Sequence, residues 1–225
     1  MEKASNVLSH PNPNASNTGR ERALLKAQFC FEEECYHWLE NGQKRKFYLC
    51  HRLDSATSGL IVGSIEKNNS SELKKMFREH KIKKKYLAVT SGFLQFEKGV
   101  WKDSLVKKKI KGKIRVQRGK EVNSITKFKR IRNQSGGLNL NLIELYPITG
   151  KTHQLRVQCM LRKVPIVGDK TYGDFAVNQR VQKATKLKRL CLHSAKIEFT
   201  IQSKGEEITV NVESPLPRPI GRLLI

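Results

Sequence analysis

The sequence predicts an α+β fold, and two observations lead to that class. Strand-length apolar runs such as residues 59–65 and 86–90 are interspersed with helix-length segments such as residues 152–161, without the regular alternation of a parallel α/β sheet. Hydrophobic residues make up 38% of the 225-residue chain, with 7 Pro and 15 Gly. That composition can bury a core, in one domain or two closely packed subdomains.

The first part of the chain is expected to begin irregularly. Residues 1–20 contain two prolines and many Asn and Ser residues, which favour turns. A helix is expected over residues 24–39, because this segment ends at the turn signal Asn41-Gly42. The apolar run of residues 59–65 has the length of a strand.

The remaining elements follow from periodicity and composition. A helix capped within residues 69–71 would place its apolar side chains on one face. Residues 97–135 are basic and interrupted by glycine, so we expect an extended hairpin or loop region that contacts the ligand. The other expected elements are a strand over residues 86–90, a strand over residues 138–146 that ends at Pro147, a helix over residues 152–161 and a strand pair over residues 190–212 that turns at Lys204-Gly205.

The charge of the chain predicts an anionic partner. Lys and Arg number 44 against 20 Asp and Glu, which gives a formal net charge of +24 and a pI near 10.1. The basic residues cluster in residues 81–85, 107–111 and 127–132, a pattern that favours nucleic acid over a membrane surface. We expect a cytoplasmic protein, because there is no apolar stretch of about 20 residues and no apolar signal core at the N-terminus.

The cysteines give no functional signal. They are five in number, widely spaced, and form no pair of C-x-x-C motifs that would complete a zinc site. We therefore expect reduced thiols packed as small apolar side chains, and no metal.

One acidic residue stands out, in the segment H-R-L-D-S-A-T-S-G at residues 51–59. Asp54 lies between an arginine and a Thr-Ser-Gly turn, directly before an apolar strand. The hydroxyl and amide groups of such a turn can hold a catalytic carboxylate in place. From these residues alone, an aspartate that only caps the turn is the commoner interpretation.

Several segments share the motifs of one family, in that family's order. Residues 51–59 match H-R-L-D-x-x-T-S-G, residues 84–92 are similar to K-x-Y-x-A-x-V-x-G, and residues 149–157 are similar to T-G-R-T-H-Q-I-R-V. Further agreement lies in residues 165–173, 192–195 and 214–217. Over nearly all of residues 45–218 the chain therefore resembles the RluA family of RNA pseudouridine synthases.

The resemblance implies both a fold and a site. The fold would be the pseudouridine synthase catalytic fold, a mostly antiparallel mixed sheet with flanking helices and a central basic cleft, in a single domain over residues 1–225. Asp54 would be the catalytic aspartate, Tyr86 would stack on the target uracil and act as an acid or base, and Arg156 would pair with Asp54. The residues expected to bind substrate are Arg52, which would fill the gap left by the extruded base, Leu155, which would line the uracil pocket, His51, and Lys151, which would lie near an RNA phosphate.

The implied chemistry needs no cofactor. Pseudouridine formation breaks the N1–C1′ bond, turns the base and joins C5 to C1′, so nothing is oxidised. The carboxylate of Asp54 could attack C1′ or remove a C2′ proton, and both routes stay open. Arg156 would keep Asp54 ionised, since an opposite charge within a few Å favours the anion by about 1–3 pK units.

The chain also departs from the family pattern. Family members usually open with a strand leading into N-K-P-[AS]-G-h-x-V-H-P, where h is apolar. Residues 3–11 are similar to a remnant of this segment, with Ala4 in place of the proline and Asn6 in place of the glycine. We expect neither the preceding strand nor a separate RNA-binding domain, so one sheet edge is in doubt and RNA binding should depend on the catalytic domain and residues 97–135.

Two other functions are compatible with parts of the sequence. A catalytically silent RNA-binding or ribosome-assembly protein could share the fold, although it would not need Asp54, Tyr86 and Arg156. A DNA-binding protein would fit the charge, although no helix-turn-helix or zinc pattern supports it. We expect a monomeric enzyme that modifies structured RNA, with tRNA slightly favoured over rRNA.

Overall fold

The computed structural model describes residues 1–12, 22–110, 113–134, 138–203 and 205–225. The chain forms two compact units. Unit 1 contains Met1–Lys83 and Lys196–Ser214, and unit 2 contains Lys84–Ala195 and Pro215–Ile225. The predicted α+β class is confirmed, whereas a single catalytic domain over residues 1–225 stays a prediction.

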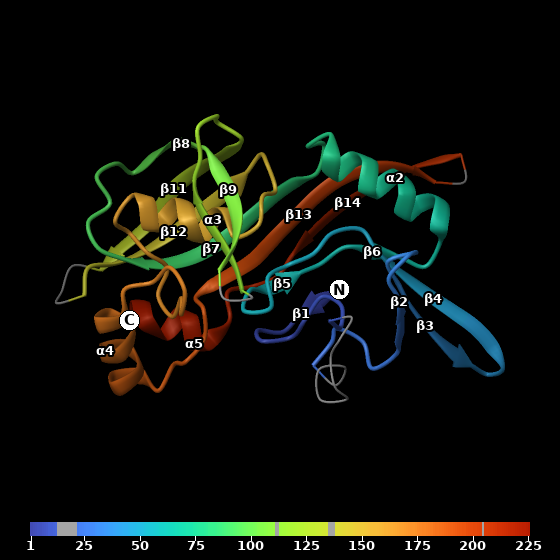
Figure 1. Ribbon diagram of the computed structural model, residues 1–225, viewed down its shortest axis with the longest axis horizontal. Coiled ribbons are helices and arrows are strands. Elements are labelled where there is room, and N and C mark those ends of the chain that lie inside the picture. Colours follow the sequence, from blue (N-terminus) through green and yellow to red (C-terminus); the bar gives the residue numbers. More distant parts are fainter. Residues whose placement is uncertain (13–21, 111–112, 135–137, 204) are drawn as a thin grey trace. The chain divides into compact units, whose positions relative to one another are not determined.

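In its described residues, unit 1 holds two groups of strands and helix α2 (Figure 1). In the first group the order is β1-β5-β13, and β14 pairs with β13. In the second the order is β2-β3-β4-β6, with every pair antiparallel. The bounds of these elements are β1 Glu2–Lys3, β2 Gln28–Cys30, β3 Cys35–Glu40, β4 Gln43–Leu49, β5 Ser58–Leu60, β6 Gly63–Ser64, α2 Lys67–Arg78, β13 Leu192–Ser203 and β14 Glu206–Glu213.

The core of unit 1 lies where helix α2 meets β5 and β13. Leu73 and Met76 lie on the buried face of α2 and pack with Leu60, Ile197 and Phe199. Helix α2 begins at Lys67, with Glu66 as an N-cap that makes no side-chain cap hydrogen bond. It therefore begins before the predicted caps at residues 69–71.

The expected helix over residues 24–39 is wrong, because this part of unit 1 forms β2 and β3 instead. Asn41 and Gly42 have φ angles of 51° and 76° and join β3 to β4, with Glu40 opposite Gln43. A two-residue hairpin loop with both φ angles positive matches the twist of antiparallel strands. The Asn-Gly pair therefore reverses a strand rather than ending a helix.

Strand β13 is divided between the units, because unit 2 contains its residues 192–195 and unit 1 contains the rest. Unit 2 is built on the strand order β13-β7-β12-β11-β8, in which β7, β12, β11 and β8 pair antiparallel (Figure 1). Strands β9 and β10 form a separate antiparallel hairpin, which we call the basic ribbon. The bounds are β7 Lys83–Ser91, β8 Lys98–Asp103, β9 Leu105–Ile110, β10 Lys113–Arg118, β11 Ser124–Gln134, β12 Leu140–Pro147, α3 Gln154–Leu161, α4 Phe175–Thr185, α5 Arg218–Gly221 and η1 Arg222–Leu224.

Helix α3 is held against the strands by a buried polar network. Gln154 donates to the Thr126 hydroxyl at 2.9 Å, and that hydroxyl donates to Gln158 at 2.6 Å. The Asp103 carboxylate then accepts from Gln158 at 2.9 Å and from Arg162 at 2.6 Å. Gln154, Gln158 and Arg162 recur every four residues, so one face of α3 is fixed on the β8 and β11 side.

The ribbon packs on the same helix. Leu105 and Val116 of the ribbon form a buried apolar cluster with Val157 of α3 and with Tyr172. The region of residues 97–135, expected to be an extended hairpin or loop, therefore consists largely of strands, and its β9–β10 part rests on α3. Helix α4 was not predicted. Its N-cap is Asp174, whose carboxylate accepts from the backbone N–H groups of Ala176 and Val177.

Helices that could cross a membrane are absent from the described parts of the chain.

Candidate active site

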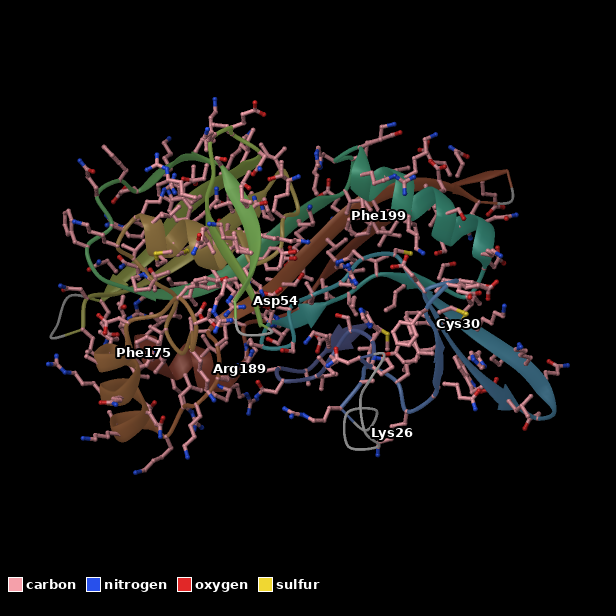
Figure 2. The ribbon with its side chains drawn as sticks, viewed as in Figure 1. Lys26, Cys30, Asp54, Phe175, Arg189 and Phe199 are labelled. Atoms are coloured by element: carbon pink, nitrogen blue, oxygen red, sulfur yellow. The ribbon has the colours of Figure 1, made fainter. Side chains whose placement is uncertain are left out.

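Asp54 lies in unit 1 on a tight turn before β5, where Figure 2 labels it. Its backbone carbonyl accepts the N–H of Thr57 at 3.0 Å, which closes the turn. The Asp54 side chain is half-buried, whereas Thr57 and Ser58 are buried. Gly59 has a φ of 104°, a conformation that favours glycine, so the T-S-G sequence fits the exit from this turn.

The N-terminal segment holds the backbone on both sides of Asp54. The donors are side chains of residues 3–9, and the acceptors are the carbonyls of the residues before and after the aspartate. Lys3 Nζ donates to Ser55 O at 3.0 Å, Ser5 Oγ donates to Ala56 O at 2.8 Å and Ser9 Oγ donates to Leu53 O at 2.9 Å. Ser9 Oγ also accepts the Leu53 N–H at 3.0 Å. These bonds hold the backbone of the turn that carries the Asp54 carboxylate.

Lys3 is almost fully buried, at 1% exposure. Its ammonium also donates to the carbonyls of Ala4 at 3.0 Å and Val7 at 2.7 Å. Strand β1, which carries Lys3, pairs with β5. The start of the chain, where one sheet edge was in doubt, therefore forms a strand at the edge of that sheet. The remnant motif is thus the part of unit 1 that supports the Asp54 turn.

The two residues before Leu53 point in different directions. The His51 ring lies 4.4 Å from the Phe77 ring, and its Nε2 accepts the N–H of Val62 at 3.0 Å. These contacts give His51 a structural role, and its contact with substrate stays a prediction. Arg52 is exposed, with Nη1 3.2 Å from Nε2 of His10, and can therefore reach a ligand.

In unit 2, Arg156 of helix α3 forms a bidentate ion pair with Asp169. Its Nε lies 2.7 Å from Oδ2, and its Nη2 lies 2.8 Å from Oδ1. Both side chains are buried, at 9% and 1% exposure. Burial raises the pKa of Asp169, but the hydrogen bonds and charge of Arg156 outweigh this effect, so the net pKa lies below its usual value.

Tyr172 covers one face of the same guanidinium. The Arg156 Cζ lies 5.1 Å from the centre of the Tyr172 ring. The Tyr172 hydroxyl accepts the Val116 N–H at 3.0 Å and lies 2.8 Å from Nδ1 of His153. His153 is the N-cap of α3 and has a φ of 54°. Tyr172 therefore joins the basic ribbon to the start of the helix that carries Arg156.

The other predicted residues of unit 2 lie on α3 and β7. Tyr86 is in β7, opposite Leu145 of β12, and is 9% exposed. Leu155 lies in α3 and is 7% exposed. Lys151 is exposed just before α3, and its backbone N–H donates to the Gln154 side chain at 3.0 Å, a position open to an anion.

Asp54 belongs to unit 1, whereas Tyr86, Leu155 and Arg156 belong to unit 2. The predicted Arg156–Asp54 pair and the predicted central basic cleft would both join the two units, so they stay predictions. In the described part of the chain, no group of three or more His, Cys, Asp and Glu side chains could hold a metal ion.

A family model described as RNA pseudouridylate synthase matches residues 1–161. The chain belongs to this family. It is 34% identical over 177 residues to the "Dual-specificity RNA pseudouridine synthase RluA" of Haemophilus influenzae, covering 76% of each chain. It is 33% identical over 187 residues to the "Ribosomal large subunit pseudouridine synthase C" of Salmonella typhimurium, covering 81% of this chain and 56% of that relative.

Solved structures agree with this family assignment. "Human RNA Pseudouridylate Synthase Domain Containing 1" is 27% identical, with a TM-score of 0.62 over 75% of this chain and 69% of that one. "Human RNA Pseudouridylate Synthase Domain Containing 4" shares the fold, with a TM-score of 0.66 over 99% of this chain and 88% of that one. The predicted RluA-type family, the pseudouridine synthase fold and the enzyme class, an isomerase acting on RNA, are confirmed.

Sequence reasoning missed two groups of residues around the pseudouridine synthase motifs. Lys3 and Ser9 lie in the segment similar to the family's opening motif, but their hydrogen bonds to the Asp54 turn were not predicted. Asp169 and Tyr172 lie in the segment G-D-K-T-Y-G, which carried the resemblance without an assigned role. The acid and the tyrosine within that motif were the signal in the sequence from which a role could have been predicted.

Proposed function

We propose that this pseudouridine synthase isomerises a specific uridine in structured RNA, with tRNA slightly favoured over rRNA, by flipping the base and using Asp54 as its essential residue. The observation that carries this proposal is the construction of the Asp54 turn. Side chains of residues 3–9 hold the backbone carbonyls on both sides of Asp54, while its own side chain stays half-buried. A carboxylate held in this way is preorganised for a reacting group.

The reaction needs a carboxylate and no redox partner. The N1–C1′ bond of the uridine breaks, the base turns, and a C5–C1′ bond forms. In the overall balance C5 loses a proton and N1 gains one. The ionised Asp54 supports this by attacking C1′ or by removing a C2′ proton, and in both cases it must enter the reaction as the anion.

Arg156 and Tyr86 would complete the chemistry. Arg156 is buried and rigidly oriented by Asp169, so a carboxylate placed beside it would be stabilised as the anion. Tyr86 is a mostly buried tyrosine on β7, and an aromatic ring there can stack on a uracil. Leu155, equally buried at the start of α3, would contribute apolar contact to the same base.

Exposed basic side chains would contact the RNA around the target uridine. A uridine within a stem must leave the base stack, which costs a few kcal/mol. Arg52, exposed and two residues before Asp54, would occupy the gap that the base leaves. Lys151, exposed before α3, would contact a phosphate, because its ammonium and the positive end of the helix dipole both attract anions. His51, which is partly exposed beside Arg52, would also contact the substrate.

The names of the relatives include both dual-specificity and ribosomal enzymes, so the test must cover all RNA classes. Pseudouridines are mapped in total RNA from cells with and without the gene, and after add-back of the wild-type, Asp54→Asn or Asp174→Asn forms. Asp174→Asn is the matched control, because it makes the same charge change at a helix N-cap where Asn is equally good.

We expect one site to disappear without the gene, and to return with the wild type and with Asp174→Asn only. Loss of a tRNA site supports the favoured substrate, and loss of an rRNA site contradicts that preference alone. Rescue by Asp54→Asn contradicts the role of Asp54. An unchanged map without the gene would favour the catalytically silent RNA-binding protein.

A further inference from the structure

We propose that Asp169 and Tyr172 are positioning residues that hold the Arg156 guanidinium in its working orientation, with Tyr172 also linking this orientation to the basic ribbon. The inference rests on the proposed role of Arg156 beside the reacting carboxylate. Asp169 and Tyr172 themselves are not assigned any contact with RNA.

Asp169 binds one edge of the Arg156 guanidinium. The carboxylate binds Nε at 2.7 Å and Nη2 at 2.8 Å. A planar guanidinium held through two parallel bonds cannot rotate about its long axis. A second acceptor must therefore use the other N–H groups, two on Nη1 and one on Nη2, so Asp169 determines the edge through which Arg156 can bind another carboxylate.

Asp169 is itself fixed. Its Oδ1 accepts the backbone N–H of Thr171 at 2.8 Å and of Tyr172 at 3.0 Å, and Asn178 donates to its backbone carbonyl at 3.0 Å. The residue is 1% exposed. A buried carboxylate with this many fixed donors behaves as a rigid support rather than as a titrating group.

Tyr172 packs on one face of the same guanidinium. The Tyr172 ring lies under it, 5.1 Å from Cζ to the ring centre, which restricts tilting. With the His153 proton on Nε2, the Tyr172 hydroxyl donates to Nδ1 at 2.8 Å and accepts the Val116 N–H at 3.0 Å. Tyr172 thus contacts the guanidinium, the N-cap of its helix and strand β10 at once.

A second arginine of the α3 region provides an internal comparison. Arg162, the C-cap residue of α3, has the same types of neighbour, with Nη1 2.6 Å from Asp103 Oδ2 and Cζ 5.2 Å from the Trp101 ring. This pair fixes the other end of the helix and no catalytic role is proposed for it. Asp103→Asn is therefore a structural control for Asp169→Asn.

The test compares single-turnover rates at saturating RNA with dissociation constants, at a temperature where urea titration shows each variant to be folded. Asp169→Asn should lower the rate about 100-fold, the usual consequence of displacing a catalytic group by about 1 Å, and change affinity less than about threefold. Asp169→Glu should recover part of the rate. Tyr172→Phe, which keeps the ring, should lower the rate about fivefold, and Asp103→Asn less than about threefold.

A double-mutant cycle separates positioning from general destabilisation. If Asp169 acts only through Arg156, then adding Asp169→Asn to the Arg156→Lys variant should lower the rate by less than about threefold. Asp103→Asn should change the rate by the same factor in the wild type and in the Arg156→Lys variant. Independent effects of Asp169→Asn and Arg156→Lys would overturn the inference. So would wild-type rates for both Asp169→Asn and Tyr172→Phe while Arg156→Lys is impaired. Unimpaired Arg156→Lys would instead refute the proposed role of Arg156.

Discussion

Asp54 combines a fixed backbone with an accessible side chain. Replacing it by Ala should abolish turnover, because the reacting carboxylate is lost, and should change RNA affinity by less than about tenfold, because phosphate contacts supply most of the affinity. Single-turnover assays and filter-binding titrations on the same RNA measure the two effects. A loss of binding that accompanies the loss of turnover would contradict this separation.

Lys3 is the residue whose removal should loosen the Asp54 turn most. Its ammonium donates to three backbone carbonyls from a site with 1% exposure, and hydrogen bonds to charged groups contribute about 1.5–3 kcal/mol each. Lys3→Met, which keeps the apolar stem, should lower the free energy of unfolding by about 2–4 kcal/mol. Urea unfolding measures this change.

Lys44 gives the control for Lys3. It lies exposed on β4 in the same unit, so Lys44→Met should change the free energy of unfolding by less than about 0.5 kcal/mol. Equal effects of the two substitutions would show that Lys3 does not support the turn.

Single residues were predictable where a motif carried them. Asp54, Tyr86 and Arg156 could be proposed as site residues because their neighbours in sequence form recognisable patterns, and their roles stay predictions. The bonds of Lys3 to Ser55 and of Ser9 to Leu53 span 52 and 44 residues, and no local pattern encodes them. The bidentate partner of Arg156 lies 13 residues further along the chain and depends on how α3 packs in unit 2.

At the scale of elements, the basic ribbon gives the sharpest prediction about RNA. Leu105 and Val116 attach it to α3, while Lys107 and Lys108 are exposed on β9. The double variant Lys107→Ala/Lys108→Ala should weaken RNA binding and reduce the slope of log affinity against log salt by about one per lost phosphate contact. Titrations between about 50 and 200 mM salt measure this slope.

The control removes the same charge from another element of unit 2. Lys183, in the last turn of α4, and Lys188, just beyond that helix, are exposed. Lys183→Ala/Lys188→Ala should leave most of the salt slope intact. If both double variants reduce the slope equally, the ribbon is not a preferred docking element.

The elements were predictable where the apolar pattern was clear. Strands β7 and β12 were found within a few residues of their bounds, because residues 86–89 form an apolar run of strand length and residues 138–146 nearly alternate. Helix α3 was also found, although its apolar residues 155, 157, 159 and 161 recur every two residues rather than at the helix period. Residues 24–39 failed because Asn41-Gly42 was taken as a helix end, although the same pair is also a strong hairpin signal. The run of residues 59–65 divides into β5 and β6, since the two strands pair in different sheets.

At the scale of the whole molecule, the buried thiols predict a loss of stability at alkaline pH. Burial raises the pKa of Cys50 to about 11 and of Cys191 to about 12, from 9.0. The folded protein therefore holds these protons more tightly than the unfolded chain. This contribution to stability is fully present below pH 9 and is lost as the pH rises through about 11 to 12.

Urea unfolding under reducing conditions checks this sign. Between about pH 9 and 10.5 the free energy of unfolding should fall by up to about 1.4 kcal/mol per thiol per pH unit. About 0.5 M salt screens repulsion among the surplus lysines. Cys50→Ala should make the decline shallower, and constant stability up to about pH 10.5 would contradict the prediction.

The route of the chain through the two units has a consequence for biosynthesis. The path leaves unit 1 after Lys83, returns at Lys196 within β13, and leaves again after Ser214. Neither unit is a contiguous piece of polypeptide, so neither can be excised or expressed alone as an intact body. On the ribosome, unit 1 lacks β14 until residue 213 has emerged, and unit 2 lacks its closing turns α5 and η1 until residue 224. Unit 1 can therefore finish folding only after β14 has emerged, and unit 2 only after η1 has emerged.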